Sequence, residues 1–176
     1  MNRFAIPLLA FVLLVVVFGV SLKRAPEKQF VKSAMIGKVA PEFSLPNLLE
    51  EGATVNSATF KGHWYLLNVW GTWCVECRAE HQTLLDIQRD GKAAVVGLNY
   101  KDDDTAARQW LMELGNPYTV VAVDREGRAA IDYGVYGAPE SFLVNPEGVI
   151  VHKVVGVITP ESWRTTMLPL IEGVSK

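Results

Sequence analysis

The two cysteines of the chain, Cys74 and Cys77, lie three positions apart in the stretch GTWCVECRAE, residues 71–80. Such a pair can close a structural loop, bind a metal or exchange disulfides. A structural disulfide here would close a very small loop and remove little entropy from the unfolded chain. A zinc site commonly needs a second Cys or Cys/His pair, which is absent beside this one. Copper(I) needs only two thiolates, and His81 could face the same side of a helix, so copper binding stays an alternative.

The position of the pair favours redox exchange. The preceding run WYLLNVW, 64–70, is apolar and rich in β-forming residues, which predicts a strand buried on both faces. A helical pattern begins at Cys74, where backbone N–H groups and the helix dipole favour a thiolate. Cys77 would lie one turn further on and be more buried. We therefore predict that Cys74 is the nucleophile and Cys77 the resolving thiol.

Two neighbours of the cysteines are candidate site residues. Trp73 would cover one side of the Cys74 sulfur and contact the substrate. Glu76 places a negative charge between the cysteines, which should raise the thiol pKa. A less stabilised thiolate makes the dithiol easier to oxidise, so Glu76 favours a reducing rather than an oxidising protein.

The rest of the chain alternates between predicted strands and helices from Gly37 onward. Further strands are expected at 93–99, 118–123, 141–144 and 149–155, the last two joined by a hairpin turn at 145–148. Helices are expected at 74–89, with Leu84, Leu85 and Ile87 facing inward, at 106–114, and from Pro160 onward with Pro169 as a possible kink. The aspartates of KDDDT, 101–105, are expected to cap the helix that follows them. The pattern predicts an α/β domain with a mixed sheet flanked by helices.

The N-terminus carries an uncharged apolar run of 19 residues, 4–22. As a helix it would span about 28 Å, close to the thickness of a bilayer core. The apolar region of a signal peptide is usually shorter, about 7–15 residues. We expect an uncleaved anchor over 1–24, a tether over 25–36 and one domain over 37–176. Basic residues are more numerous after the run than before it, which by itself would place the domain in the cytoplasm. The net charge of −2 gives no basis for nucleic-acid binding.

Four segments together resemble one known family. They are GKVAPEFSLPNL (37–48), LLNVWGTWCVECRAEH (66–81), VVGLNYKDD (95–103) and GVYGAPESFLVNPEGVI (134–150). The chain resembles the DsbE, or CcmG, family of thiol:disulfide interchange proteins, which are membrane-tethered, thioredoxin-like proteins of cytochrome c maturation. The resemblance covers nearly the whole chain. Its GVYGAPE and NYKDD segments are much more specific than the W-C-x-x-C motif alone.

The resemblance implies a thioredoxin-like fold with an N-terminal extension and a central insert. It implies a single-pass protein of the bacterial inner membrane with a periplasmic domain, which would overrule the count of basic residues. No cofactor besides the redox-active disulfide is implied, and no metal. Electrons would come from a membrane thiol reductant of the DsbD or CcdA type. They would pass to the C-x-x-C-H disulfide of apocytochrome c, directly or through a CcmH-type partner.

Residues distant from the cysteines also match the family. Pro139 matches a cis-proline that faces the active site, and the backbone of Ala138 would pair with an extended substrate. Glu140 matches an acidic residue beside the site, which could relay a proton or raise a thiol pKa. Its alternative is a solvated carboxylate at a strand start. Asn68 stands where thioredoxin has a buried aspartate that deprotonates the second cysteine. Because an amide cannot take a proton, either Glu140 or water would do so here, or the exchange would be slower and more specific to its partner.

Other functions remain as alternatives. Within redox chemistry, the chain could be a general periplasmic thiol reductase with many substrates. A copper(I) chaperone using both cysteines and His81 is the alternative from another class. A peroxidase is disfavoured, because the P-x-x-x-T-x-x-C arrangement of peroxiredoxins is absent.

Overall fold

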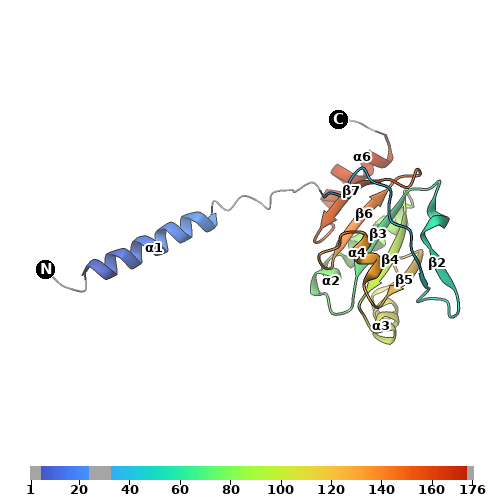
Figure 1. The fold of residues 1–176 in the computed structure, drawn as a ribbon, viewed down its shortest axis with the longest axis horizontal. Coiled ribbons are helices and arrows are strands. Elements are labelled where there is room, and N and C mark those ends of the chain that lie inside the picture. The colour runs from blue at the N-terminus through green and yellow to red at the C-terminus, as the bar shows by residue number, and fades with distance from the viewer. Residues whose placement is uncertain (1–4, 24–32, 174–176) are drawn as a thin grey trace. The chain divides into compact units, whose positions relative to one another are not determined.

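The structure is a computed structural model of the chain, and it describes residues 5–23 and 33–173. The chain divides into two compact units, Met1–Ser33 and Ala34–Lys176. Most of the expected tether, 25–32, lies outside the described residues. Besides one helix of the first unit, the structure describes the sheets and the remaining helices, all of which belong to the second unit (Figure 1).

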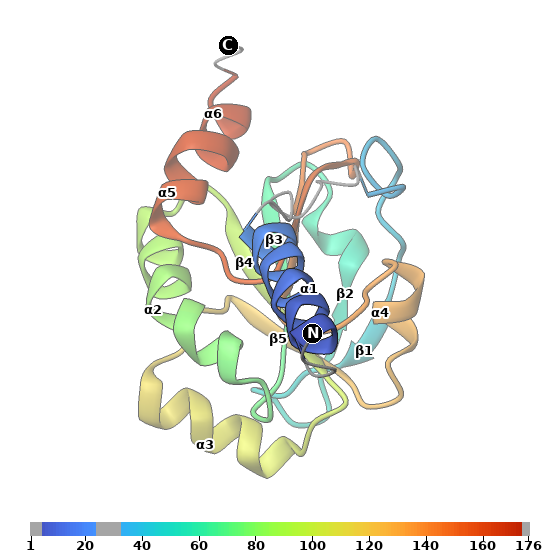
Figure 2. The same ribbon diagram turned by 90° about the vertical axis from the view of Figure 1, so that its left-hand side faces the viewer.

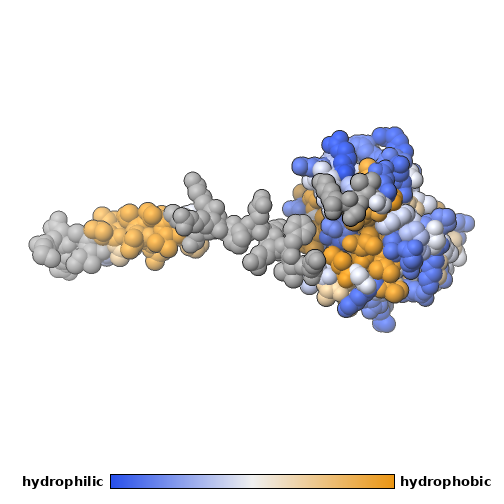
Figure 3. All heavy atoms as spheres, turned by 90° about the horizontal axis from the view of Figure 1, so that it is seen from above, coloured by the Kyte–Doolittle hydropathy of each residue, from blue (hydrophilic) through white to orange (hydrophobic). Residues whose placement is uncertain are grey.

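The first unit contains one described helix, α1 (Ala5–Lys23). Its side chains from 7 to 19 are exposed, and they include a run of large apolar residues from Leu8 to Phe18, visible in Figure 3. Among the described residues, however, no helix is both long and apolar enough to cross a membrane. The expected anchor over 1–24 therefore stays a proposal.

The second unit is built on a mixed five-stranded sheet with the order β5-β4-β3-β6-β7. Strands β3, β4 and β5 are parallel, whereas β6 is antiparallel to β3 and to β7. The strands are β3 (Tyr65–Trp70), β4 (Ala94–Tyr100), β5 (Val120–Asp124), β6 (Glu140–Val144) and β7 (Ile150–Val155). Ahead of them, β1 (Ser44–Pro46) and β2 (Thr54–Asn56) form a two-stranded antiparallel sheet.

Helices cover both faces of the five-stranded sheet (Figure 2). The helices of the second unit are α2 (Val75–Asp90), α3 (Asp104–Leu114), α4 (Arg128–Asp132), α5 (Pro160–Ser162) and α6 (Leu168–Ile171), with a 3-10 helix at Ser57–Phe60 and a π-helical turn at Trp163–Met167. One core cluster joins α2, α3 and the C-terminal helices to the sheet. A second cluster packs α4 and the β1–β2 sheet against the opposite face.

The alternation of side chains along β3 assigns its residues to the two clusters. Leu66 and Trp70 lie in the cluster with α2, and Leu67 and Val69 lie in the cluster with α4. All six residues of the strand are buried, as the uninterrupted apolar run predicted. Asn68, between Leu67 and Val69, therefore points toward the α2 face from inside an apolar strand.

The predicted strands and main helices are confirmed to within two residues at most of their ends. The mixed sheet with helices on both faces is also confirmed. The capping prediction holds for Asp103, whose side chain accepts from the Ala106 backbone N–H at the start of α3. It is wrong for Asp102, which instead binds the loop before the cysteines.

Candidate active site

The two cysteines lie at the start of α2, directly after the loop that leaves β3. They form a disulfide, with Cys74 as the N-cap residue and Cys77 in the first turn. Cys74 Sγ accepts the backbone N–H of Cys77 over 3.1 Å. Cys74 is 5% exposed and Cys77 is 2% exposed, so both residues are buried and the first is slightly the more exposed. The helix N-terminus that favours a thiolate at Cys74 is thus present.

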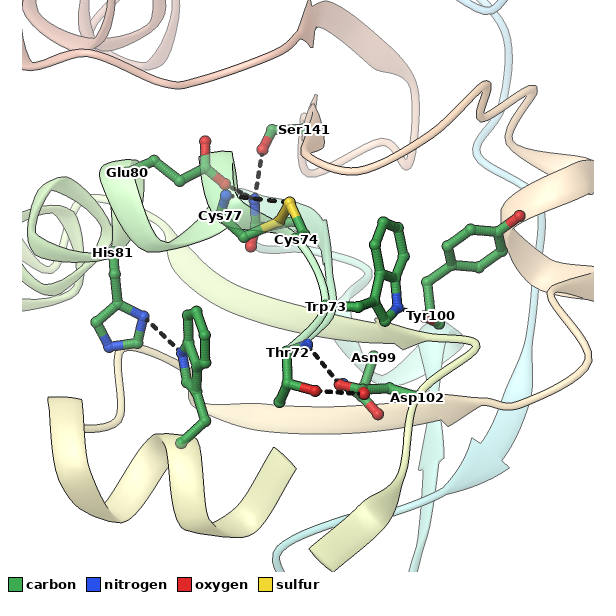
Figure 4. Close-up of a disulfide and its surroundings, with 12 residues drawn as sticks. Thr72, Trp73, Cys74, Cys77, Glu80, His81, Asn99, Tyr100, Asp102 and Ser141 are labelled. Carbon is green, nitrogen blue, oxygen red and sulfur yellow. Dashed lines mark hydrogen bonds between the residues drawn. A yellow bond between two sulfur atoms is a disulfide. The ribbon is translucent and has the colours of Figure 1, made fainter. Parts of the chain in front are cut away.

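The loop before the cysteines is held by Asp102, which follows the end of β4. Its carboxylate accepts the backbone N–H of Thr72 over 2.7 Å and the Thr72 hydroxyl over 2.6 Å. The amide of Asn99 donates to the same carboxylate over 2.9 Å. The backbone at Lys101 is in the left-handed region, with φ of 49°, just before Asp102. These bonds fix the segment that carries Trp73 and Cys74 (Figure 4).

Trp73 is half exposed, at 51%. Its indole N–H donates to the carbonyl of Tyr100 over 3.2 Å, and its ring meets the Tyr100 ring edge-on. A β-carbon at position 71 would come within 2.5 Å of the indole nitrogen, so the absence of a side chain at Gly71 leaves room for the Trp73 ring. The indole is held as an exposed aromatic surface beside Cys74 (Figure 4), where a partner's chain can reach it.

Asn68 takes part in a buried hydrogen-bond network beneath the disulfide. Its amide nitrogen donates to Glu80 Oε1 over 2.7 Å and to Ser141 Oγ over 2.9 Å. Its amide oxygen accepts the hydroxyl of Tyr118 over 2.8 Å. The second oxygen of Glu80 accepts the backbone N–H of Ile158 over 2.8 Å. Asn68 and Glu80 are both fully buried.

Glu80 lies three positions after Cys77, on the same face of α2 (Figure 4). Side chains three apart on a helix are neighbours, with β-carbons about 5–6 Å apart. Burial, together with a smaller effect of the Glu76 charge, raises the pKa of Glu80 to about 7 against the opposing effect of the hydrogen bonds from Ile158 and Asn68. A carboxyl group that titrates near neutral pH can both take and return a proton.

The cis-proline segment reaches the site through the antiparallel pairing of β6 with β3. The Ala138–Pro139 peptide bond is cis. Glu140 pairs with Val69, so Pro139 and Ala138 lie level with the end of β3 that leads to the cysteines. Ala138 packs against the core cluster that contains both cysteines. The structure thus brings Pro139 and Ala138 to the same end of the sheet as the disulfide.

Glu140 is not the solvated carboxylate of the alternative interpretation, because it is 1% exposed. Its Oε2 forms an ion pair with Lys153 of β7 over 2.8 Å, and its Oε1 accepts the backbone N–H of Tyr136 over 2.9 Å. Lys153 also donates to the carbonyl of Gly134 over 2.8 Å. The buried pair therefore holds the loop that precedes the cis-proline. This geometry makes Glu140 a support of the loop, and the buried acid hydrogen-bonded to Asn68 is Glu80.

His81 does not provide the third ligand considered for copper. Its Nδ1 accepts the indole N–H of Trp110 over 3.2 Å, which leaves Nε2 to donate to the carbonyl of Gly115 over 2.9 Å. Both ring nitrogens are therefore occupied. Burial lowers the pKa of His81 and favours this neutral form. Across the described residues, no group of three or more His, Cys, Asp or Glu side chains could hold a metal ion.

The sequence interpretation missed Glu80 and Asp102 as site residues. Glu80 had a signal, because positions 77, 80, 84 and 87 follow the spacing of one helix face, and a carboxylate on an apolar face needs a partner. The partner, Asn68, had been identified, but not as a hydrogen-bond donor to Glu80. Asp102 had no comparable signal, since its neighbours Asp103 and Asp104 behave as ordinary helix-capping and first-turn residues.

Comparison with known proteins gives the family. A family model described as Redoxin matches residues 35–167. The thiol:disulfide interchange protein DsbE of Vibrio cholerae serotype O1 is 44% identical over 170 residues, which cover 95% of this chain and 92% of that protein. The DsbE of Haemophilus influenzae is 39% identical over 178 residues, with coverage of 99% and 98%. This chain belongs to the DsbE family of thiol:disulfide interchange proteins.

A solved structure agrees at the level of the fold. A secreted thiol-disulfide isomerase from Corynebacterium glutamicum matches with a TM-score of 0.69 and 23% identity, over 77% of this chain and 86% of that one. The fold is thus thioredoxin-like. As a DsbE-type protein, the chain is a thiol:disulfide oxidoreductase with Cys74 and Cys77 as its C-x-x-C pair.

Proposed function

We propose that the chain is a periplasmic, membrane-anchored dithiol reductant that acts on the C-x-x-C-H disulfide of apocytochrome c, directly or through a CcmH-type partner. The observation that carries the chemistry is the pair at the start of α2 with Glu80 beneath it, titrating near neutral pH. A substrate restricted to cytochrome c maturation is supported by the likeness to DsbE proteins. No cofactor is needed beyond the redox-active disulfide.

The reaction begins from the reduced protein. The Cys74 thiolate attacks one sulfur of the substrate disulfide, forms a mixed disulfide and releases the other substrate sulfur as a thiolate, which takes a proton from solvent. Cys77 then loses its proton and attacks Cys74 Sγ. This step forms the Cys74–Cys77 disulfide and releases the second substrate thiolate. The substrate gains two electrons and the protein loses them.

Glu80 is the proposed acceptor of the Cys77 proton. It lies on the same face of α2 one turn away, and its pKa of about 7 lies below the ordinary pKa of a thiol but near the working pH. In the sequence interpretation this task fell to Glu140 or water. Glu140 is less suited to it, because both of its carboxylate oxygens are engaged by Lys153 and Tyr136.

The proposed function also requires contacts with the substrate, an attachment to the membrane and a source of electrons. Trp73 and the backbone of Ala138 would contact the substrate chain, with Pro139 beside the sulfurs. The N-terminal segment 1–24, whose described part is the apolar helix α1, would anchor the protein in the inner membrane with its domain in the periplasm. A membrane thiol reductant of the DsbD or CcdA type would return electrons to the oxidised pair.

Trapping of partners tests this proposal. A Cys77→Ala variant cannot resolve its mixed disulfide, so it should accumulate covalently bound apocytochrome c or a CcmH-type protein. Cys74→Ala, with the nucleophile removed, is the matched control and should capture neither. Capture of many unrelated periplasmic proteins in comparable amounts would instead support a general thiol reductase, and a strain without the protein would then keep normal levels of c-type cytochromes.

A further inference from the structure

Tyr118 contacts the hydrogen-bond network around Glu80, although it precedes a strand that lies two places away from β3 in the sheet. It precedes β5, and β4 stands between β5 and β3. Its side chain is nearly completely buried, at 4% exposure. The ring stacks on Trp70, with centroids 5.3 Å apart and planes 20° apart. Beyond this stacking, its hydroxyl donates to Asn68 Oδ1 over 2.8 Å.

Gly97 of β4 makes this reach possible. It is the register partner of Asn68 in β3 and of Val121 in β5. A β-carbon at position 97 would lie 2.9 Å from Trp70 Nε1 and 3.0 Å from Tyr118 Cγ. Such distances overlap with both rings. The missing side chain of Gly97 thus leaves room for the Tyr118 ring to cross β4.

The Tyr118 hydroxyl, which burial keeps protonated, stabilises one of the two directions of the Asn68 amide. An asparagine amide has one accepting oxygen and one donating nitrogen, and the two can exchange places by rotation. The Tyr118 hydroxyl donates to the oxygen, which leaves the nitrogen to donate to Glu80 and to Ser141. A reversed amide would turn its oxygen toward the carboxylate of Glu80, where two acceptors would face each other.

We propose that Tyr118 is a positioning residue of the exchange reaction, which holds the Asn68 amide so that its nitrogen donates to Glu80. This inference rests on the proposed role of Glu80 as acceptor of the Cys77 proton. A donor aimed at the carboxylate favours its ionised form, in which it can accept a proton. Without the Tyr118 hydroxyl, burial would dominate and Glu80 would stay protonated at a higher pH.

The other groups around Glu80 either change its pKa or exchange a proton with it. On its own helix, Glu76 raises the pKa of Glu80 by repulsion and Cys77 supplies the proton. From the C-terminal segment, the Ile158 N–H lowers the pKa of Glu80. Tyr118 faces it from the β5 side, and burial together with the Glu80 charge raises the pKa of the Tyr118 phenol, which therefore stays a neutral donor.

The decisive variant is Tyr118→Phe, which removes the hydroxyl and keeps the ring that stacks on Trp70. The pKa of Glu80 is measured by carbon NMR of its labelled carboxyl group in the disulfide form, so that no thiol titrates nearby. We expect an upward shift of about one unit, the usual effect of losing one hydrogen bond to a charged group. Tyr133→Phe, which alters a fully buried tyrosine in the opposite core cluster, should leave it unchanged. Asn68→Leu, which removes the donor itself, should give the same shift as Tyr118→Phe.

A kinetic readout separates this inference from the proposed function. In a protein carrying glutathione on Cys74, the rate at which Cys77 releases the glutathione is measured against pH. Tyr118→Phe should move the midpoint of this profile upward by the same amount, and should change nothing further in a Glu80→Gln background. An unchanged Glu80 pKa in Tyr118→Phe overturns the inference. An unchanged rate profile in Glu80→Gln overturns the proposed role of Glu80, whatever Tyr118→Phe does to its pKa.

Discussion

The carboxyl group of Glu80 is fully buried near the disulfide, and its burial affects the stability of the fold as well as the chemistry of the site. Its pKa is about 7 in the folded protein, against an ordinary value of 4.5. Between these values the folded state holds a proton that the unfolded state has lost. Stability should therefore fall as the pH rises from about 4.5 to about 7, by about 3 kcal/mol in total. Urea unfolding of the oxidised protein over this pH range measures the slope.

The variant Glu80→Gln isolates this contribution, because its side chain does not titrate. Its unfolding free energy should lack the part of the slope that belongs to Glu80. Glu113→Gln, on the exposed face of α3, should keep the slope of the unaltered chain. Identical slopes for the Glu80→Gln variant and the unaltered chain would show that Glu80 titrates normally in the folded state.

The buried ion pair of Glu140 and Lys153 predicts a second effect at this scale. Lys153→Met should destabilise the domain by about 3–5 kcal/mol, because it leaves the Glu140 carboxylate buried without its partner. The double variant Glu140→Gln, Lys153→Met should recover most of this loss. Chemical unfolding of the single and double variants measures both changes. A loss below about 1 kcal/mol in the single variant would contradict a buried, charged pair.

At the scale of residues, the sequence predicted what depends on local spacing. Cys74 and Cys77 were assigned from their position between a strand and a helix. Asn68 was identified as a departure from thioredoxin, but its hydrogen bonds come from residues up to 73 positions away. Such contacts depend on how strands pair, and no local pattern in a single sequence carries them. The sequence interpretation therefore assigned the removal of the Cys77 proton to Glu140 or water rather than to Glu80.

At the scale of elements, the C-terminal helix begins with a capping box. Thr159 Oγ1 accepts the N–H of Ser162, and Ser162 Oγ accepts the N–H of Thr159. Thr159→Ala should destabilise the domain by about 1 kcal/mol, since it removes one of these bonds. Thr165→Ala, further along and exposed, should change stability by less than about 0.5 kcal/mol. Thermal unfolding compares the two, and equal effects would mean that the cap contributes nothing.

Elements with a clear period or stop signal were predictable, and short ones were not. The strands of the five-stranded sheet are apolar runs, and α3 begins with aspartates and ends at Gly115. Helix α4 has only five residues, too few for a period to show. The C-terminal helix was predicted from Pro160, with a kink at Pro169. In the structure it widens into a π-helical turn at Trp163–Met167, ahead of that proline.

At the scale of the whole molecule, the division at Ser33 and Ala34 predicts that the two units are separable. A fragment of residues 34–176 keeps both core clusters and the whole hydrogen-bond network around Glu80. It should unfold cooperatively within a few degrees of the full chain in detergent and reduce a glutathione disulfide at the same rate. Circular dichroism and a thiol-exchange assay measure these properties. A fragment that fails to fold would show that the first unit contributes to the domain.

Local patterns in the sequence did not predict the order of the strands in the five-stranded sheet either. The sequence predicted a mixed sheet and a hairpin, and both are confirmed. That β6 would pair with β3, and so bring residue 140 beside residue 69, was not predicted, and the resemblance to DsbE proteins implied only that Pro139 faces the active site. In physical terms, the pairing is selected by the packing of two buried faces at once, which one-dimensional periodicity does not encode.

The partners of Glu80 come from widely separated parts of the chain. Asn68 of β3 is also bound to Tyr118, ahead of β5, and to Ser141 of β6, and Ile158 lies just before α5. During synthesis the cysteines emerge long before Ile158 does. A nascent chain, or one truncated before Ile158, would thus carry the C-x-x-C pair without all of the neighbours that set the pKa of Glu80. Full reductase activity would then appear only when the segment that contains Ile158 packs against the domain, so the chemistry of the site would depend on folding of the C-terminal part of the chain.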